Sequence, residues 1–284
     1  MTGTVAVFAD KLGPRGKVKV TIATIVGTAV LVLLLFVAYR RFEANGQLEG
    51  ELWSKLFKGD APQFFWDGLK VTLKLAALGL SLALALGVVL VLARLSKRRV
   101  VRWVATVWLQ FFRGVPLVVL ILFFYFGFDQ SSFRAVVIGL VLYNSTVLAE
   151  IFRAGILSLD RGQSEAALAV GMTDGQAMRM VVFPQAVRRM VPALVSQLVV
   201  LLKDTSLGVA VSLEELLRRG QLAGEALKNP LQALLFVAAI YMVVNLLLSA
   251  LARRIERRQG QGRSKKAAPG GPVRVTGVED LSVA

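Results

Sequence analysis

The stretch EAALAVGMTDGQAMRMVVFP, residues 165–184, lies between two strongly apolar runs of the chain and differs from both in composition. Glu165, Asp174 and Arg179 are charged, and two glycines interrupt any regular apolar pattern. A helix that crosses a bilayer core needs about 20 predominantly apolar residues. We therefore expect residues 165–184 to form a connection outside the hydrocarbon layer, between two segments that cross it.

The rest of the chain is rich in runs of membrane-spanning length. Of its 284 residues, 56% are hydrophobic, and they gather into six blocks. Lipid offers the backbone no hydrogen-bond partners, so each block is expected to be a helix; the strict alternation of a transmembrane barrel is missing. The sequence predicts an all-α integral membrane protein with about six transmembrane helices, at Thr21–Tyr39, Leu69–Leu92, Val104–Phe128, Phe133–Ile151, Met190–Val211 and Leu231–Ala252.

Basic residues are unevenly distributed along the chain, which has a formal net charge of +16. If the amino terminus is inside, basic runs such as 97–102 and 253–266 fall on the cytoplasmic side, and the outer segments hold far fewer Lys and Arg residues. This is the positive-inside pattern. We expect a multi-pass protein of the cell membrane with both termini in the cytoplasm, whose charge contacts membrane lipid and not nucleic acid.

The chain contains no cysteine and no histidine. Disulfides, thiolate and imidazole metal sites and a histidine general base are therefore excluded, and we predict no metal site and no catalytic residue. The first apolar block follows a hydrophilic leader and is longer than the core of a signal peptide, about 7–15 residues. We therefore expect it to be retained as a membrane span.

Helix-capping and helix-ending residues are expected to divide the connection between the fourth and fifth spans, residues 156–187, into two short helices. Gly171 can adopt the left-handed conformation that ends the first helix. Pro184 is expected to close the second helix and also suits the first turn of the next span. Two capping boxes are expected, Asp160 with Gln163 and Thr173 with Gln176.

A charged residue stands within the third predicted span. Arg113 falls near mid-membrane if residues 104–128 form one helix, and a central arginine costs about 2.5–3.5 kcal/mol unless it faces protein or water. Gly114 and Pro116 follow it and favour a local opening of the helix. Arg113 is equally consistent with a carboxylate or backbone partner in a translocation path and with a clamp at an internal helix end.

Further polar residues stand in the fourth and fifth spans. Lys203, Asp204, Thr205 and Ser206 include cap and breaker residues and predict a distorted or broken helix, and such breaks are favoured sites for zwitterionic substrates. For Asp204, a role as a structural brace is as consistent with the sequence as substrate contact. For Lys203, a brace is somewhat less consistent than substrate contact. Asn144 and Gln197 are candidates of the same kind, with hydrogen bonds between helices as the competing explanation.

Residues 165–184 also match a spaced motif. The pattern EAA, three residues, Gly, nine residues, then Val-Val-Phe-Pro resembles the EAA loop of permease subunits of bacterial binding-protein-dependent ABC importers, with Val181 and Phe183 as conservative departures. Three stretches are similar to the polar amino-acid branch of that family, and the resemblance covers about residues 60–252. These stretches are FFRGVPL at 111–117, LAEIFRAGI at 148–156 and LLKDTSL at 201–207.

The resemblance implies a type I importer (MetI-like) permease domain over residues 69–252, in which the EAA loop docks as a coupling helix on a separate ATPase. It also implies a dimer of ATPase subunits, a second permease subunit, identical or paralogous, and an extracytoplasmic amino-acid-binding protein. ATP and Mg²⁺ would be bound by the ATPase, because this chain has no G-x-x-x-x-G-K-[ST] loop. The resemblance assigns coupling to Glu165, Ala166, Ala167, Gly171, Asp174 and Pro184.

Segments outside the permease domain have their own expected roles. We expect a cytoplasmic lead over residues 1–20, an extra first transmembrane helix over 21–39 and an external interfacial segment over 40–68. The basic, then Gly- and Pro-rich residues 253–284 are expected to be a disordered cytoplasmic tail.

The function implied is ATP-driven amino-acid uptake, with a weak preference for glutamate because Arg113 and Lys203 suit a carboxylate. These cations would serve any α-carboxylate, so the substrate stays open. An ion-gradient-driven secondary transporter is the alternative, but it would need an inverted repeat, which the sequence does not display. A membrane enzyme is a third class of function, which the sequence disfavours because the chain lacks His, Cys and paired cytoplasmic carboxylates at catalytic spacing.

Overall fold

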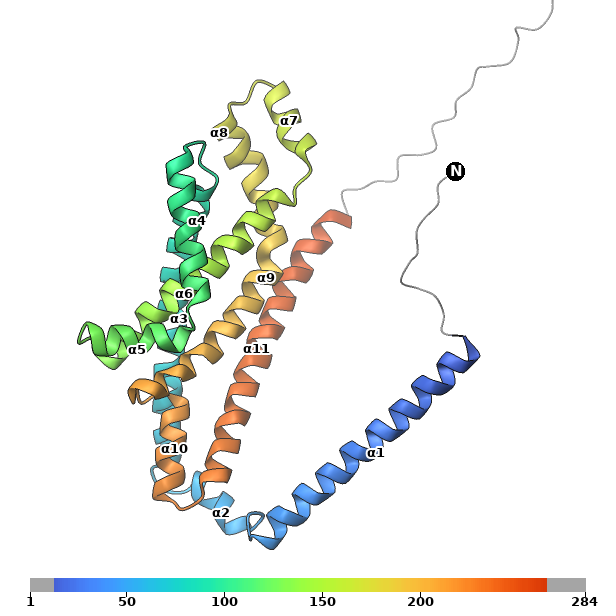
Figure 1. Cartoon of the computed structure of the whole chain (residues 1–284), viewed down its shortest axis with the longest axis vertical. Helices are drawn as coiled ribbons and strands as arrows, with labels where there is room; N and C mark the ends of the chain where they lie inside the picture. The colour runs from blue at the N-terminus through green and yellow to red at the C-terminus, as the bar shows by residue number, and fades with distance from the viewer. Residues whose placement is uncertain (1–12, 265–284) are drawn as a thin grey trace, which may run out of the picture.

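The computed structural model describes residues 13–264, and all regular structure within that range is helical (Figure 1). In chain order the elements are α1 (Pro14–Ala44), α2 (Gly50–Ser54), the 3₁₀ helix η1 (Lys55–Phe57), α3 (Ala61–Arg94), α4 (Arg99–Gly114), α5 (Leu117–Gly127), α6 (Ser132–Leu157), α7 (Arg161–Ala169), α8 (Asp174–Ala177), the π-helix η2 (Met178–Val182), α9 (Phe183–Asp204), the 3₁₀ helix η3 (Thr205–Val211), α10 (Leu216–Ala226) and α11 (Pro230–Ser264).

Five helical segments are long and apolar enough to cross a membrane, and they correspond to five of the six predicted spans. They are 16–44, 61–94, 132–157, 174–211 and 230–251. The all-α architecture is therefore confirmed within the described residues. Several of these segments begin well before the predicted apolar block, because the helical hydrogen-bond ladder continues through the polar residues that flank each span.

The third predicted span, Val104–Phe128, is wrong as a single helix. The chain breaks between α4 and α5, whose axes are bent by 96°. Pro116 has no backbone N–H and disfavours helical geometry in the residue before it, and Val115 is extended with φ −87° and ψ 127°. The opening expected at Gly114 and Pro116 is thus confirmed, but it is a sharp turn that projects α5 sideways (Figure 1).

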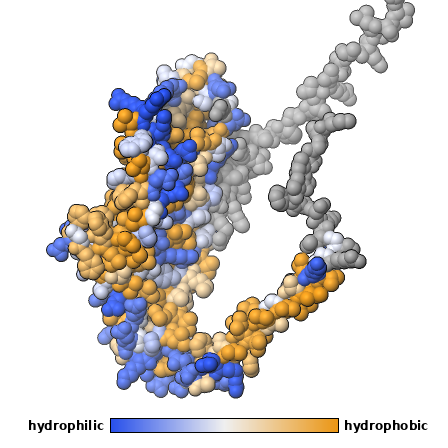
Figure 2. Space-filling model, in the orientation of Figure 1, coloured by the Kyte–Doolittle hydropathy of each residue, from blue (hydrophilic) through white to orange (hydrophobic). Residues whose placement is uncertain are grey.

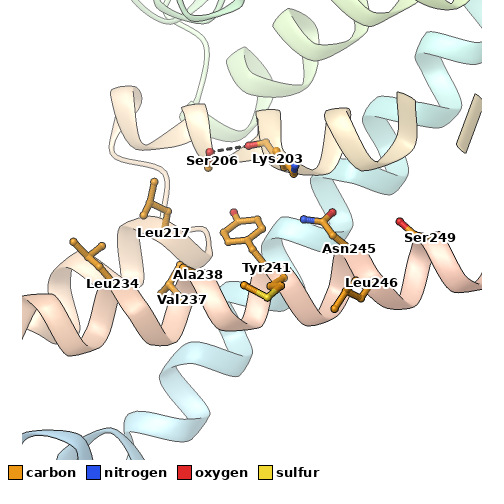
Figure 3. A pocket seen from close by; sticks show the side chains of 11 residues that line it. Lys203, Ser206, Leu217, Leu234, Val237, Ala238, Tyr241, Asn245, Leu246 and Ser249 are labelled. Atoms are coloured by element: carbon orange, nitrogen blue, oxygen red, sulfur yellow. Dashed lines mark hydrogen bonds between the residues drawn. The ribbon is translucent and has the colours of Figure 1, made fainter. Parts of the chain in front are cut away.

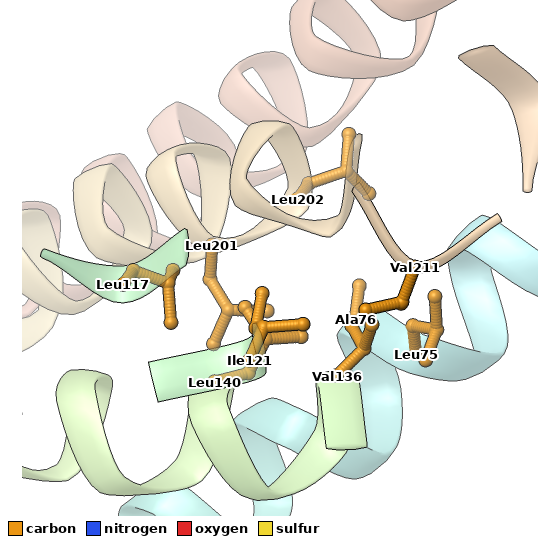
Figure 4. Packing of buried hydrophobic residues seen from close by; sticks show 9 residues of the cluster. All are labelled: Leu75, Ala76, Leu117, Ile121, Val136, Leu140, Leu201, Leu202 and Val211. Atoms are coloured by element: carbon orange, nitrogen blue, oxygen red, sulfur yellow. The ribbon is translucent and has the colours of Figure 1, made fainter. Parts of the chain in front are cut away.

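The core lies where α3, α5, α6, α9 and η3 meet. Of the described helix pairs, α3 and α6 have the most extensive contact. Their axes approach closely at Gly87, where an added Cβ would lie 3.2 Å from Leu148 Cβ. The main cluster is drawn in Figure 4 and consists of Leu75, Ala76, Leu117, Ile121, Val136, Leu140, Leu201, Leu202 and Val211.

Helix α1 stands away from this bundle. The apolar window of α1 has no buried residue, and Figure 2 shows apolar side chains covering both this arm and the bulge formed by α5. The link after α1 is anchored: Gln232 Nε2 donates to Gln47 O at 2.7 Å, and Asn229 Nδ2 donates to Leu52 O at 2.7 Å. The exposed apolar surface of α1 is thus combined with a fixed end beside the start of α11.

The predicted cytoplasmic lead, residues 1–20, and the predicted tail, residues 253–284, have different boundaries in the structure. Helix α11 continues to Ser264, past the predicted end of the last span at Ala252, and Arg, Glu and Gln are good helix formers. The expected disorder of the tail stays a prediction. Helix α1 begins at Pro14, inside the predicted lead. The remaining parts of those two predictions, residues 1–12 and 265–284, lie outside the described residues.

Helices α10 and α11 form a tight antiparallel hairpin that returns the chain into the bundle. An added Cβ at Gly224 would lie 2.7 Å from the Pro230 Cα atom, and one at Gly220 would lie 2.4 Å from Val237 Cγ2. Real Cβ atoms do not approach other atoms so closely. The two glycines therefore set the spacing of the hairpin.

We expect Gly224→Ala to destabilise the protein by about 1–3 kcal/mol, because the backbone at Pro230 must move to admit the methyl group. The measurement is the thermal unfolding midpoint of the detergent-purified protein. Gly27→Ala is the matched control, since a Cβ at Gly27 in α1 meets nothing within 4 Å. Equal midpoints for the two variants would contradict the assigned role of the hairpin.

Candidate functional site

The predicted coupling segment consists of α7, a turn at Gly171 and α8. Gly171 has φ +85°, which confirms the expected left-handed conformation. The Thr173 and Gln176 capping box is present, with both reciprocal hydrogen bonds. Asp160 caps α7 by accepting from Gly162 N at 2.9 Å. Its expected partner is not used, because the side chain of Gln163 instead accepts from Gln185 Nε2 at 3.1 Å.

Pro184 does not close a second short helix, and that part of the prediction is wrong. The chain stays helical from α8 through η2 into α9, with Pro184 in the first turn of α9. A proline ring clashes with the carbonyl group four residues earlier in a regular α-helix, and the wider π-helical turn directly before Pro184 relieves that clash. Helix α8, η2 and the fifth span therefore form one continuous helical rod, which begins at Asp174.

The tip of this segment exposes small and apolar side chains. Glu165 and Ala166 are exposed, whereas Ala167 is buried. Val170 is 74% exposed and Met180 is 65% exposed, and Leu168 is also exposed. An exposed apolar patch beside small residues is typical of a protein contact surface.

Contacts tie this tip to the bundle at the same end. Lys97 Nζ, in the loop between α3 and α4, lies 3.4 Å from Asp174 Oδ2. Arg189 donates to the carbonyl oxygen of Ser158, which joins α9 to the end of α6. Movement of the tip therefore reaches α6 and α9 directly.

Polar residues of the fourth and fifth spans form a buried clamp. Gln197 Nε2 donates to Asn144 Oδ1 at 2.7 Å, and Asn144 Nδ2 donates to Leu140 O at 3.0 Å. Asn144 is fully buried and Gln197 nearly so. Asp204 lies beside Asn144. This arrangement matches the brace interpretation for Asn144 and Gln197, whose role in substrate contact stays a prediction.

The expected break at the end of the fifth span is present. Helix α9 ends at Asp204, and the chain continues as the 3₁₀ helix η3 from Thr205. Thr205 is buried and donates to Leu202 O at 2.7 Å, and Ser206 Oγ donates to Lys203 O at 2.7 Å. The Lys203 side chain is exposed. Lys203 and Ser206 line a cavity beside this break.

That cavity, of about 610 Å³, lies between the α9–η3 junction and α11. Figure 3 shows Tyr241 and Asn245 of α11 pointing toward the helix that carries Lys203. Ser249 continues the polar edge one turn further, and the other lining side chains are apolar. Asn245 Oδ1 is buried without a hydrogen-bond partner among the described residues.

Sequence reasoning missed the α11 side of this cavity. Tyr241, Asn245 and Ser249 are spaced four apart in an otherwise apolar span, so they lie on one helix face. That spacing was the available signal. Arg113, by contrast, is exposed at the end of α4 and is not among the residues that line the cavity.

Glu215 was also missed, and it holds the outer hairpin to the bundle. Its side chain caps α10 by accepting from Leu217 N at 2.9 Å and from Arg218 N at 2.8 Å. Tyr241 donates its hydroxyl to Glu215 Oε2 at 3.0 Å. Burial raises the pKa of the Glu215 carboxyl above its ordinary value. Glu215 thus fixes Tyr241, one wall of the cavity.

Comparison with known proteins identifies the family. Residues 77–261 match the family described as the binding-protein-dependent transport system inner membrane component. The chain belongs to this family. Helix α1 lies outside the matched range.

The permease has similar relatives along most of its length. It is 42% identical over 231 residues to the glutamate transport system permease protein GluD of Corynebacterium glutamicum, covering 78% of this chain and 85% of GluD. It is 36% identical over 210 residues to the arginine transport system permease protein ArtQ of Bacillus subtilis, covering 71% and 96%. A crystal structure of an amino acid ABC transporter with histidines matches with a TM-score of 0.67 at 34% identity, covering 70% of this chain and 95% of that chain.

The permease is thus a multi-pass inner-membrane subunit of an amino-acid ABC importer, with a MetI-like fold. Its relatives are permease subunits rather than enzymes. The family implies partnership with an ATPase and a binding protein.

We expect the Asn144 and Gln197 side chains to act as a structural brace. Asn144→Ala leaves the buried Gln197 amide without its acceptor and should cost about 1–3 kcal/mol in the free energy of unfolding. Gln197→Ala should cost a similar amount, and the double variant should cost less than the sum of the two. The measurement is a double-mutant cycle by thermal unfolding. Additive losses together with a raised KM for uptake would instead indicate substrate contact.

Proposed function

We propose that this permease carries an acidic amino acid, with glutamate preferred, and that Lys203 binds a carboxylate of the substrate in the cavity between α9 and α11. The observation that carries the proposal is a single cation on the wall of a cavity whose lining residues include no Asp or Glu. The similarity to a relative named for glutamate transport supports the same substrate class.

The cavity suits a small zwitterion with a negative side chain. Its volume of about 610 Å³ falls within the range of small-molecule sites, about 300–1,000 Å³. Its walls are mostly apolar, so a charge inside it is less screened than in water. Lys203 attracts a carboxylate, while Asn245 Oδ1 is an unused acceptor that suits the substrate ammonium group. Ser206 and Ser249 offer further hydroxyl groups.

The energy for transport would come from a dimer of ATPase subunits that binds ATP and Mg²⁺, with no cofactor held by this chain. A second permease subunit, identical or paralogous, would complete the path, and an extracytoplasmic binding protein would deliver the amino acid. The coupling tip at Glu165, Ala166 and Gly171 would contact the ATPase in the cytoplasm, which requires both termini of this chain to lie inside. The exposed apolar patch around Val170 and Met180 supports that contact.

A continuous helix links the coupling tip to the end of α9 that carries Lys203. The helical rod that begins at Asp174 in the coupling tip ends at Asp204, beside Lys203. A rod of α9's length spans about 33 Å. Displacement of the tip by the ATPase would therefore move Lys203 against α11 and change the width of the cavity.

We expect Lys203→Gln to lower kcat/KM for glutamate uptake by roughly tenfold to a hundredfold, because a charge-assisted hydrogen bond of about 1.5–3 kcal/mol is lost. Glutamine uptake should fall less, since glutamine lacks the side-chain carboxylate of glutamate. The measurement is competition-controlled uptake in proteoliposomes containing the full importer. Lys58→Gln, on an exposed lysine outside the cavity, is the matched control. An equal loss for both substrates would contradict carboxylate selection by Lys203.

Gly171→Val should uncouple uptake from ATP hydrolysis, because a β-branched residue is strained at φ +85° and the tip must change shape. Glu165→Lys should do the same by reversing an exposed charge at the contact. Uptake and ATPase rate are measured in the same proteoliposomes, and both variants should hydrolyse ATP with less than about a tenth of normal uptake. Gly175→Ala, where a Cβ meets nothing within 4 Å, is the control. Normal uptake in both variants would remove the tip from the coupling contact.

A further inference from the structure

A second cavity, of about 580 Å³, lies at the coupling end of the bundle, between the end of α3, the start of α4 and α6. It is lined by four arginines from three helices. Trp103, Val100 and Thr106 complete the wall. The full cationic set, which we term the arginine pocket, is Arg94, Arg99, Arg102 and Arg153.

Within residues 13–264, the arginine pocket has only one acidic partner. Glu150 pairs with Arg94, and it lies 3.6 Å from the Arg153 guanidinium. Arg99 and Arg102 have no carboxylate within ion-pair distance in that described range. Arg102 has one long hydrogen bond, from its Nη1 atom to Ser96 O at 3.5 Å. The pocket therefore has a clear excess of positive charge.

The position of these arginines increases the need for an anion. Helix α4 begins at Arg99, has no side-chain cap and has no acidic residue in its first turn. The N-terminus of a helix carries a partial positive charge, so basic residues there are unfavourable unless an anion is present. Two features, the charge of the pocket and the uncapped helix start, thus favour the same kind of ligand.

The surface beside the pocket identifies the source of the anion. Val100 is 74% exposed, Trp103 is 67% exposed and Val104 is 53% exposed, and they form an apolar strip on α4 that leads away from the arginines. Trp is favoured at the headgroup level of a bilayer, and basic pockets at that level bind anionic headgroups. A free phosphate ion would use the arginines but leave the strip uncovered. A phospholipid would cover both.

We propose that the arginine pocket binds the headgroup of an anionic phospholipid from the leaflet on the coupling side, with the acyl chains along Val100, Trp103 and Val104. Arg99 and Arg102 bind the phosphate. Lys97, in the loop that leads into α4, contacts Asp174 of the coupling segment. Lipid bound here therefore holds that loop beside α8.

The test titrates the purified full-length permease in an uncharged detergent with dioctanoyl phosphatidylglycerol and follows tryptophan fluorescence, to which Trp103 contributes. We expect saturable binding at least tenfold tighter than that of dioctanoyl phosphatidylcholine. Arg99→Gln with Arg102→Gln should weaken binding by about tenfold or more, because charge-assisted contacts are lost. Arg99→Lys with Arg102→Lys should retain most of the affinity.

The charge-matched control is Arg40→Gln with Arg41→Gln. It removes two positive charges near the C-terminal end of α1, away from the arginine pocket, and should leave binding unchanged. Inorganic phosphate at the same concentrations should not compete. Competition by phosphate would overturn the lipid source, and equal affinity for the two lipids would overturn the headgroup assignment. Undiminished binding by the double Gln variant would place the lipid elsewhere. The readout needs neither ATPase nor amino acid, so it is independent of the proposed function.

Discussion

The absence of hydrogen-bond partners in the bilayer core is the constraint on which this structure depends. Each span must satisfy its own backbone, which is why the described chain is helical throughout its spans. Val115 and Thr205 are two of the places where the chain departs from regular α-helix. Thr205 is itself buried and bonds back to Leu202 O. Irregular backbone is tolerated at Thr205 because protein surrounds it, whereas Val115 is only partly buried.

The same constraint governs the polar side chains. Asn144 and Gln197 are buried and bond to one another, so their amides are almost fully satisfied within the bundle. Lys203 and Asn245 keep groups that face a cavity instead. The division separates a clamp, which fixes α6 against α9, from a wall that can receive a ligand. Both depend on α9, so a shift of α9 against α11 changes the cavity, and the clamp stays intact if α6 moves together with α9.

The sequence allowed the fold class and the coupling tip to be predicted, because both depend on local patterns. Apolar blocks of membrane length identified the spans, and the spacing from Glu165 through Gly171 to Pro184 identified the tip. The 96° bend between α4 and α5 could not be predicted, because Pro116 indicates a break but its angle is set by packing of α5 against α6. Continuity through Pro184 was missed since a π-helical turn has no sequence signature.

Sites that join distant parts of the chain were harder to predict than local ones. Tyr241 and Asn245 were visible as a polar face of α11, but nothing in the sequence indicates that Lys203 lies opposite them. Arg94 and Glu150 are far apart in the chain, and only the fold brings them together. The basic runs were interpreted as orientation signals and as a general contact with membrane lipid. Their grouping into a pocket required the crossing of three helices.

Positive charge is placed at two separate parts of the bundle, and our proposals assign them to different anions. Lys203 stands at the end of α9, and the coupling tip and the arginine pocket stand at the other end of the bundle, about one membrane thickness away. Screening at physiological salt reduces interactions beyond about 8 Å between exposed charges. A cation at one end therefore has little effect on an anion bound at the other. The two anions that we propose, an acidic substrate and a lipid headgroup, would therefore not compete for the same side chains.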